Sequence, residues 1–330
     1  MGWGLPCYAF QPGEVLVRRT AVLALGGNAL ARSGEDPTIT NQFRHARESV
    51  APIIELAHDG WQIAIVHGNG PQVGAELQRN EIAREQVEPL PLGVLVAATA
   101  GWIGYMLQQS LQNGLARAGV SRRVATVITQ TLVDPADPAL SAPSKPIGLE
   151  LTQSRVDALR AAGIPVGKDG AGHWRRLAAS PVPHGIVEAP LVLELVRAGV
   201  IVIAAGGGGP PVYPDPSLGL EGVDAVVDKD LVAAILARQL DAEVLMILTD
   251  VDAVYEDWGT PAARPLRTLS LEAAESLLES GTLGAGSMRP KVAAAARFVR
   301  TGGSRAVIAR LSDGPAALRG ETGTTIGRSR

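Results

Sequence analysis

The sequence is poor in the residues that mark several large classes of protein. Its single cysteine, Cys7, cannot form an internal disulfide, and this predicts a protein of the reducing cytoplasm. The 30 basic and 33 acidic residues form no basic block, which argues against a nucleic acid or an anionic membrane as partner. Because 46% of the residues are hydrophobic and 19% are charged, a disordered chain is also excluded.

The N-terminal residues do not resemble an export signal. Residues 1–20 hold no charged segment followed by an apolar one, and Pro6, Pro12 and Gly13 would break a helix there. The longest stretch without charge covers residues 89–116, which is long enough to raise the question of a membrane span. Its glycines, its glutamines and its opening prolines favour a buried or interface helix instead.

The sequence does contain an alternation of short β-branched runs with helical patterns. Runs that are apolar at consecutive positions, such as 201–203 and 246–248, are typical of a parallel sheet buried on both faces. This order predicts an α/β fold, a three-layer αβα sandwich with a mainly parallel central sheet. Strands are expected at residues 21–25, 62–66, 124–129, 200–204, 244–248 and 305–309. Helices are expected at about 41–58, 73–86, 94–118, 153–162, 188–198, 230–240, 271–280 and 291–301, with Thr152 and Ser270 as N-caps.

One region departs from this alternation. Residues 134–183 are rich in proline, show little strand periodicity and carry Lys145 and Lys168. A long irregular segment inside a compact domain usually has a functional reason. We therefore expect a small protruding subdomain that is inserted into the sheet.

The common catalytic and cofactor fingerprints are absent. The sequence has no GxxxxGK[ST] P-loop, no GxGxxG dinucleotide turn and no GxSxG nucleophile elbow. Its five histidines show no HxxxH spacing, so no metal-binding residues are predicted. Of these histidines only His67 lies beside a glycine loop, where we expect a structural hydrogen bond.

Three glycine loops follow predicted strands. They read LGGNAL from residue 25, HGNGPQVG from residue 67 and AGGGGP from residue 205. In an open α/β sheet, ligands bind beyond the carboxyl ends of the strands. Glycine lets backbone N–H groups approach an anion there, with help from the N-termini of the following helices. Three such loops at one edge predict a phosphate or carboxylate site.

Only four of the 30 basic residues are lysines, and three of these have distinctive neighbours. Lys229 begins a predicted helix in the run DKD, Lys291 follows GSMRP at the start of another helix, and Lys145 lies in SKPIG. A lysine at a helix N-terminus opposes the macrodipole unless an anion also occupies the site. We interpret Lys229 and Lys291 as phosphate contacts.

The order of seven motifs resembles the carbamate kinases of the amino acid kinase family. The motifs are LGGNAL, HGNGPQVG, SKPIG, GGGGPPV, VDKD, LTDVDAVY and GSMRPK, within residues 20–327. Most of the family carries a lysine ahead of the first Gly-Gly. Carbamate kinases resemble this sequence in lacking it and in supplying a lysine from the KPIG segment instead. The resemblance implies an N-terminal tail at 1–19, a carbamate-binding lobe at 20–222 with the subdomain inserted at about 134–183, and a nucleotide-binding lobe at 223–330.

The resemblance implies reversible phosphoryl transfer between ATP and carbamate, with Mg2+ carried by the nucleotide and no general base. The implied catalytic residues are Asn28, Lys145, Lys229, Asp230 and Lys291, with Asp230 orienting the lysines. The implied substrate and phosphate contacts are Gly26, Gly27, Gly68, Asn69, Gly70, Gly207 and Gly208. The implied nucleotide contacts are Asp250, Val251, Tyr255, Gly286, Met288 and Pro290.

Two segments depart from the family pattern. Ala100 stands where the family usually has glutamine, and residues 169–175 read DGAGHWR without the family's arginine. Two other functions stay open: a kinase of another small acid on this fold, and a non-catalytic nucleotide sensor. The retained lysines favour an enzyme, because a sensor needs no charge neutralisation at the transferred group. The predicted helix at 94–118, which is uncharged as far as residue 116, predicts a homodimer together with the resemblance.

Overall fold

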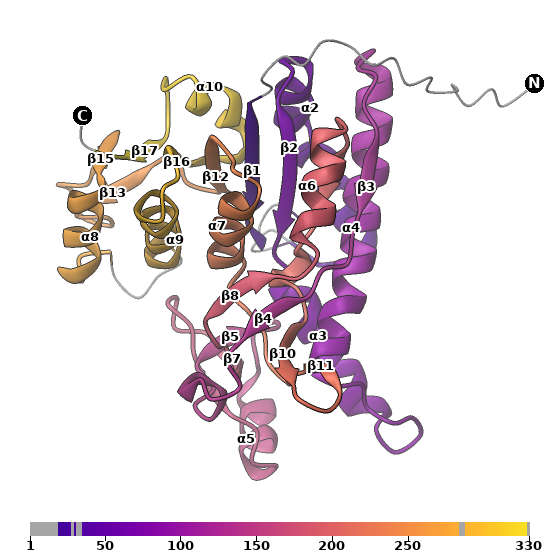
Figure 1. Ribbon diagram of the computed structural model, residues 1–330. Coiled ribbons are helices and arrows are strands. Elements are labelled where there is room, and N and C mark those ends of the chain that lie inside the picture. Colours follow the sequence, from indigo (N-terminus) through magenta and orange to yellow (C-terminus); the bar gives the residue numbers. More distant parts are fainter. Residues whose placement is uncertain (1–18, 28–29, 31–34, 284–287, 329–330) are drawn as a thin grey trace, which may run out of the picture.

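The computed structural model describes residues 19–27, 30, 35–283 and 288–328. Within these residues, the centre is an eight-stranded sheet in the order β15-β17-β16-β12-β1-β2-β9-β3 (Figure 1). All neighbours from β16 to β3 are parallel, and β17 runs antiparallel to β16. The strands are β1 (Thr20–Leu25), β2 (Gln62–His67), β3 (Val124–Thr126), β9 (Ile201–Ile203), β12 (Val244–Thr249), β15 (Thr268–Ser270), β16 (Arg305–Arg310) and β17 (Thr324–Gly327). The predicted mainly parallel sheet is confirmed.

Alternate side chains of β1 enter two separate cores. Val22 and Ala24 pack on one face of the sheet, whereas Ala21, Leu23 and Leu25 pack on the other. The strand also pairs in parallel with β2 on one side and β12 on the other. Because both faces and both edges are covered, β1 is apolar from its second residue to its last.

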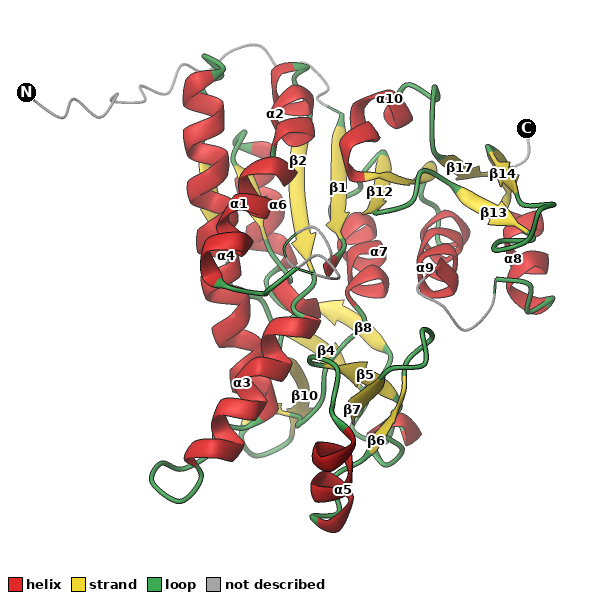
Figure 2. Cartoon of the chain, turned by 180° about the vertical axis from the view of Figure 1, so that it is seen from behind, coloured by secondary structure: helices red, strands yellow, loops and turns green. Residues whose placement is uncertain are grey.

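Helices cover the two faces of the sheet, and Figures 1 and 2 show one helix layer each in front. The layer on the Val22 side holds α6 (Ala189–Arg197), α7 (Lys229–Gln239), α8 (Leu271–Glu279) and α9 (Met288–Arg300). The layer on the Leu23 side holds α1 (Ile39–Ser49), α2 (Ala51–His58), α4 (Leu92–Arg117) and α10 (Gly314–Leu318). The predicted three-layer αβα sandwich is confirmed. Among the described helices, none combines the length and the apolar character that a membrane crossing requires.

The helix predicted over residues 41–58 is in fact two helices. The side chain of Thr38 caps α1, and α2 begins after Val50 with Pro52 in its first turn. Proline suits that position because it lacks an N–H group and its φ is fixed near the helical value. The N-caps predicted at Thr152 and Ser270 are confirmed, since both side chains accept a backbone N–H group.

Residues 134–183 hold more strand than their sequence predicts. They form a three-stranded antiparallel sheet in the order β5-β7-β6, with α5 (Gln153–Ala161) beside it, and this unit projects from the body in Figures 1 and 2. The strands β5 (Lys145–Ile147) and β6 (Val166–Lys168) have three residues each and β7 (Trp174–Ala178) has five, which is too short for a clear alternation. A second sheet, β11-β10-β4-β8, lies at its base. Its strands are β4 (Thr131–Val133), β8 (Pro183–Ile186), β10 (Pro211–Asp215) and β11 (Gly219–Gly222).

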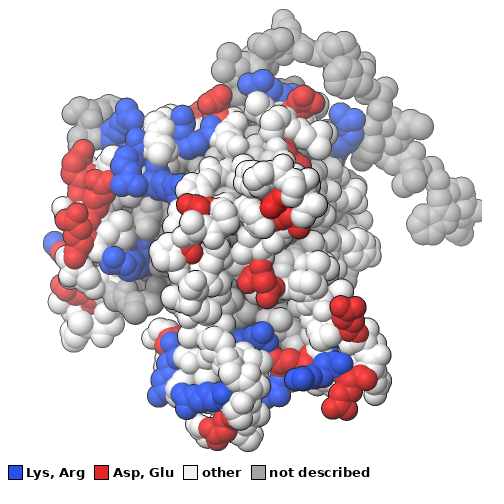
Figure 3. Space-filling view, turned by 60° about the horizontal axis from the view of Figure 1, so that its bottom comes forward, with Lys and Arg blue, Asp and Glu red and all other residues white. Residues whose placement is uncertain are grey.

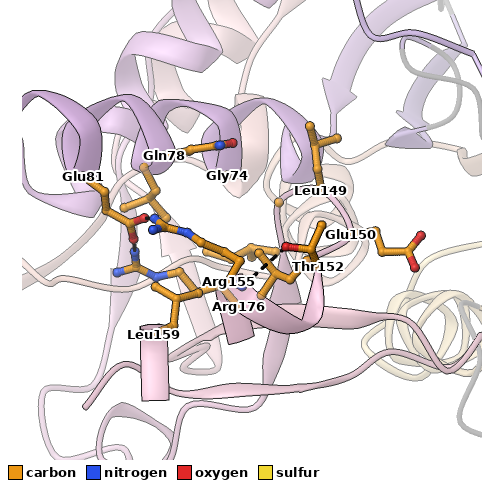
Figure 4. A pocket seen from close by; sticks show the side chains of 13 residues that line it. Gly74, Gln78, Glu81, Leu149, Glu150, Thr152, Arg155, Leu159 and Arg176 are labelled. Carbon is orange, nitrogen blue, oxygen red and sulfur yellow. Dashed lines mark hydrogen bonds and ion pairs between the residues drawn. The ribbon is translucent and has the colours of Figure 1, made fainter. Parts of the chain in front are cut away.

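The subdomain docks against α3 (Gly70–Ala83). The backbones meet so closely that a Cβ on Gly74 would lie 1.9 Å from the Cα of Gly148, so only glycine fits there. Further along α3, Glu81 forms salt bridges with Arg155 of α5 and Arg176 of β7. A pocket of about 220 Å³ opens at this joint, and Figure 4 shows both guanidinium groups reaching the Glu81 carboxylate. These salt bridges hold the subdomain in place. In the lower part of Figure 3, basic and acidic side chains lie close together at the surface.

Short elements complete the described chain. The hairpin of β13 (Val254–Glu256) and β14 (Arg264–Leu266) follows β12. Three 3-10 turns lie at 138–140, 206–208 and 311–313. Sequence periodicity did not predict the hairpin, β15, α10 or β17, because each is five residues long or less.

Candidate functional site

Three glycine loops meet at the carboxyl edge of the sheet. Gly26 follows β1, and its N–H donates to the carbonyl of Leu248 in β12 at 3.0 Å. Gly68 follows β2, and its N–H donates to the carbonyl of Leu25 at 3.2 Å. The third loop follows β9 after Ala205, whose φ of 50° is rare for a residue with a side chain. Because these strands are parallel, the loops form one floor.

The loops also contact one another, which explains two of the glycines. Gly207 has a φ of 67°, and a Cβ on it would lie 2.2 Å from the amide nitrogen of Asn69. A Cβ on Gly68 would lie 3.1 Å from the Cδ of Lys229. The Lys229 side chain therefore runs over the second loop. Asn69 is buried, and its amide donates to the hydroxyl of Thr99 at 2.9 Å, which fixes its orientation on the floor.

Two lysines share one buried carboxylate at the edge of this floor. The Nζ of Lys229 donates to Asp230 Oδ1 at 2.6 Å, and the Nζ of Lys291 donates to Asp230 Oδ2 at 3.2 Å. The Asp230 side chain is only 4% exposed. Asp230 lies in the first turn of α7 and Lys291 in the first turn of α9, and these helices pack side by side (Figure 1). The predicted role of Asp230 in orienting lysines has the contacts that it needs.

The third predicted lysine reaches the same place from the subdomain. Lys145 lies in β5, and its Nζ donates to Asp228 Oδ2 at 2.8 Å. Asp228 is the residue directly before α7 and Lys229. Lys168, the remaining lysine, instead lies over the ring of Trp174, with its Nζ 5.4 Å from the ring centroid. Three segments far apart in the sequence thus bring lysines to the N-terminus of one helix.

The lysines control the ionisation of both carboxylates. Burial alone would raise the pKa of Asp230, but the charges of Lys229 and Lys291 outweigh it and hold that pKa below its ordinary value. Burial is outweighed in the same way at Asp228, where Lys145 and Lys229 hold the pKa well below its usual range. With three ammonium groups against two carboxylates, one positive charge is left over. Such a cluster attracts an anion.

His67 ends β2 in the middle of the floor, where it is 1% exposed. Its Nδ1 lies 3.0 Å from the carbonyl of Gly68. Burial lowers the pKa of His67 to about 4, so the imidazole is neutral at pH 7. The contact with Gly68 agrees with the structural hydrogen bond that the sequence predicts.

The predicted nucleotide contacts begin where β12 ends. Asp250 and Val251 follow that strand directly, and Tyr255 lies in β13. The hydroxyl of Tyr255 donates to Asp252 Oδ1 at 2.9 Å, and this bond raises the pKa of the phenol. Residues 250–255 follow the carboxyl end of β12, at the same edge of the sheet as the glycine loops, since the carbonyl of Leu248 near that end accepts the N–H of Gly26.

Two more predicted nucleotide contacts, Met288 and Pro290, open α9, the helix that carries Lys291. They therefore lie in the same first helical turn as Lys291. Asn28 and Gly286, which the sequence also predicts in the site, lie outside the described residues. The roles of all these residues remain predictions.

Sequence reasoning assigned no role to Asp228. The signal was present, because an aspartate directly before a helix start is a preferred N-cap. Its side chain does accept the N–H groups of Asp230 and Leu231. Sequence reasoning also missed Thr131, whose hydroxyl donates to the carbonyl of Gly208 at 2.6 Å and supports the third loop. No spacing rule predicts such a contact between distant segments.

An αβα sandwich with glycine loops and a lysine cluster at the carboxyl ends of its strands has the arrangement expected of a small-molecule phosphotransferase. Residues 19–310 match the amino acid kinase family, and the chain belongs to it. A carbamate kinase of Pyrococcus horikoshii is 42% identical over 308 residues, which cover 92% of this chain and 98% of the relative. The resemblance predicted from the motifs is confirmed.

Solved structures agree with the sequence comparison. Carbamate kinase from Giardia lamblia bound to citric acid superposes with a TM-score of 0.90 at 36% identity, covering 95% of this chain and 99% of that one. The same enzyme bound to AMP-PNP superposes with a TM-score of 0.86 at 36% identity and the same coverage. The fold class is therefore confirmed independently of the sequence patterns.

The buried His67 predicts a specific loss of stability in acid. The unfolded chain binds a proton on this residue below its ordinary pKa of 6.5, whereas the folded chain binds it only near 4. The stability that neutral His67 contributes is therefore complete above pH 6.5 and is lost as the pH falls towards 4. We expect His67 to lower the free energy of unfolding by about 3 kcal/mol between about pH 7 and pH 4. His67→Asn, which keeps an N–H for Gly68, should lack this loss. Urea unfolding at a series of pH values measures it, and equal losses in both proteins would contradict the account.

Proposed function

We propose that this chain is a carbamate kinase, which transfers a phosphoryl group reversibly between ATP and carbamate. The observation that carries the proposal is the gathering of Lys145, Lys229 and Lys291 on two carboxylates beside the glycine floor. The nearly full-length similarity to carbamate kinases supports the acceptor. Carbamoyl phosphate with ADP, giving ATP and carbamate, is the reverse reaction.

Phosphoryl transfer to carbamate requires the protein to position the substrates and to neutralise the charge of the transferred group. Carbamate is already an anionic oxygen nucleophile, so no general base is needed. His67 is not suited to be one, because burial lowers its pKa to about 4 and makes it a weak base. In our proposal Lys145 and Lys291 flank the transferred phosphoryl group. Lys229 holds the phosphates of the nucleotide. Preorganised ammonium groups stabilise the charge that develops on the phosphoryl oxygens.

The glycine floor supplies the remaining contacts in this proposal. The backbone N–H group of Gly27 would cradle the phosphoryl group, whereas the N–H of Gly26, which the sequence also predicted there, already donates to the carbonyl of Leu248. The carbamate would lie on the second and third loops, at Gly68, Asn69, Gly70, Gly207 and Gly208. Asn69 is prepared for this role because its hydrogen bond to Thr99 holds its amide in one orientation. Residues 20–222 would then bind carbamate and residues 223–330 the nucleotide.

Mg2+ would enter this site with the nucleotide. The described part of the chain offers no group of three or more histidine, cysteine or carboxylate side chains that could hold a metal ion. A lysine-rich site fits a metal carried by phosphate oxygens better than one bound by the protein. Mg2+ would supply further neutralisation of the phosphate charge, and the chain's own residues would orient the phosphates.

Formation of ATP from carbamoyl phosphate and MgADP is the experiment that tests this function. We expect ATP to appear well above the rate set by spontaneous decay of carbamoyl phosphate. Acetyl phosphate in its place tests a kinase of another small acid, a possibility raised by Ala100. A folded protein that binds ADP but forms no ATP from carbamoyl phosphate or acetyl phosphate would contradict the proposal. That result would favour the alternative of a non-catalytic nucleotide sensor.

Substitution of the lysines tests their roles in the same assay. Arginine keeps the charge but replaces a compact ammonium with a planar fork. We expect Lys145→Arg and Lys291→Arg each to lower kcat by about 10²–10³, or about 2.7–4 kcal/mol of transition-state stabilisation. Lys168→Arg is the control, because Lys168 contacts the Trp174 ring instead of the cluster. Near wild-type kcat in both test variants would overturn the assignment.

We also propose a homodimer, although the structure changes the argument for it. Eight apolar residues of α4 suggested an interface in the sequence. Trp102 is half-buried against the core on the Leu23 side, and six others are buried within the chain: Leu95, Val96, Ile103, Met106, Leu107 and Leu111. The apolar residues left at the surface here are Val94 and Tyr105, 47% and 55% exposed, and Ile128, 44% exposed, beside Gly101. This narrower strip is the candidate interface.

Light scattering at micromolar concentration measures the oligomeric state. We expect twice the mass of one 34.3 kDa chain. Ile128→Asp should give a folded monomer, because a desolvated carboxylate opposes association. Leu191→Asp is the matched control, since Leu191 is also half-exposed but lies on α6, in the opposite helix layer. A monomeric wild-type protein would end the proposal.

A further inference from the structure

The carboxylate of Asp228 divides its two oxygens between two parts of the molecule. Its Oδ1 accepts the backbone N–H groups of Asp230 at 2.9 Å and Leu231 at 3.2 Å, which caps α7. Its Oδ2 accepts the ammonium group of Lys145 at 2.8 Å. One side chain thus joins the start of the helix that carries Lys229 to the lysine of the protruding subdomain.

This contact differs from those on the α3 side of the subdomain. There, Glu81 holds Arg155 and Arg176, and none of the three lies in the lysine cluster. The Glu81 salt bridges fix the base of the subdomain against the body. The Asp228 contact instead fixes the side chain of Lys145, which the proposed function places against the transferred phosphoryl group.

Lys145 needs a partner to stay in place. Its side chain is 29% exposed, and a long flexible side chain loses rotamer freedom when it is held in one position. Asp228 is 24% exposed, so it lies within reach of solvent and of the subdomain alike. An ammonium group has three N–H donors. Lys145 can therefore keep one hydrogen bond to Asp228 and donate another to an incoming anion.

We propose that Asp228 is the positioning residue of Lys145, holding the ammonium group of the subdomain over the phosphoryl site while it caps α7 with its other oxygen. The inference rests on the proposed function, because only that function gives Lys145 a phosphoryl group to contact. Asp228 acts through Lys145 and touches no reacting atom.

Asp228→Asn separates the two tasks of this side chain. Asparagine caps a helix as well as aspartate does, so the Oδ1 contacts remain. The amide that replaces Oδ2 cannot accept a hydrogen bond from Lys145. We expect kcat for ATP formation to fall about 10- to 100-fold, while KM for ADP and the thermal midpoint stay close to those of the wild-type protein. Wild-type kcat in this variant overturns the proposal.

A chemical measurement tests the same contact without catalysis. The chain has only four lysines, so their acetylation by acetic anhydride can be followed one by one by mass spectrometry of peptides. Lys145 should react faster in Asp228→Asn than in the wild-type protein, and Lys168, in the same subdomain, should be unchanged. An unchanged rate at Lys145 overturns the proposal. A wild-type protein that makes no ATP contradicts the proposed function instead, so the two failures are distinguishable.

A double-mutant cycle shows whether Asp228 acts through Lys145. Lys145→Met should cost much less activity in the Asp228→Asn background than in the wild-type background. Equal losses in both backgrounds overturn the proposal, because the two residues would then act independently. If Asp228→Asn lowers the thermal midpoint, Asp228→Ser replaces it in all three measurements. Serine also caps a helix, but its hydroxyl is too short to reach Lys145.

Discussion

The site depends on one buried carboxylate, Asp230, which holds Lys229 and Lys291 at the start of α7. Two ammonium groups at helix N-termini repel each other and oppose the macrodipoles of their helices. A carboxylate between them offsets both effects, and its own burial is compensated by their charges. Removing one partner of such a buried set typically costs about 3–5 kcal/mol, because the remaining charges are left uncompensated. The three residues therefore act as a unit.

The helices, the sheet and the inserted subdomain together bring the charged residues of the site to one edge of the sheet. The helices α7 and α9 lie side by side on one face of the sheet, which brings the first turns of both to the same edge. The parallel strands end at that edge, so the glycine loops lie below the lysines. The protruding subdomain brings Lys145 from outside the sandwich to Asp228. A site built from two rigid helices and one inserted unit suits a reaction in which charge must be neutralised at one point.

The sequence predicted the parts of the fold whose periodicity is long or whose apolar runs are continuous. The six predicted strands are present. Five of them, β1, β2, β9, β12 and β16, are buried on both faces and hence apolar throughout their centres. The sixth, β3, lies at the edge of the sheet and ends at Thr126, three residues earlier than predicted. The antiparallel sheet of β5, β6 and β7 was not predicted, since three to five residues cannot establish a period of two. The lysines were found because lysine is rare in this chain. Asp228 was not found, because its bond to Lys145 joins residues 83 positions apart. The sequence also could not predict that α4 is buried within the chain, because core helices and interface helices have the same composition.

In our proposal, lysines from three segments far apart in the sequence converge on the phosphates, with Lys145 and Lys291 at the transferred phosphoryl group and Lys229 at the phosphates of the nucleotide. A crystal structure of the protein with Mg2+ and the nonhydrolysable ATP analogue AMP-PNP measures this most directly. The account predicts that the Nζ atoms of Lys145, Lys229 and Lys291 lie within hydrogen-bond distance, about 3 Å, of phosphate oxygens, with Asp230 still between the last two. A γ-phosphate bound away from these lysines, with their hydrogen bonds to Asp228 and Asp230 unchanged, would contradict it.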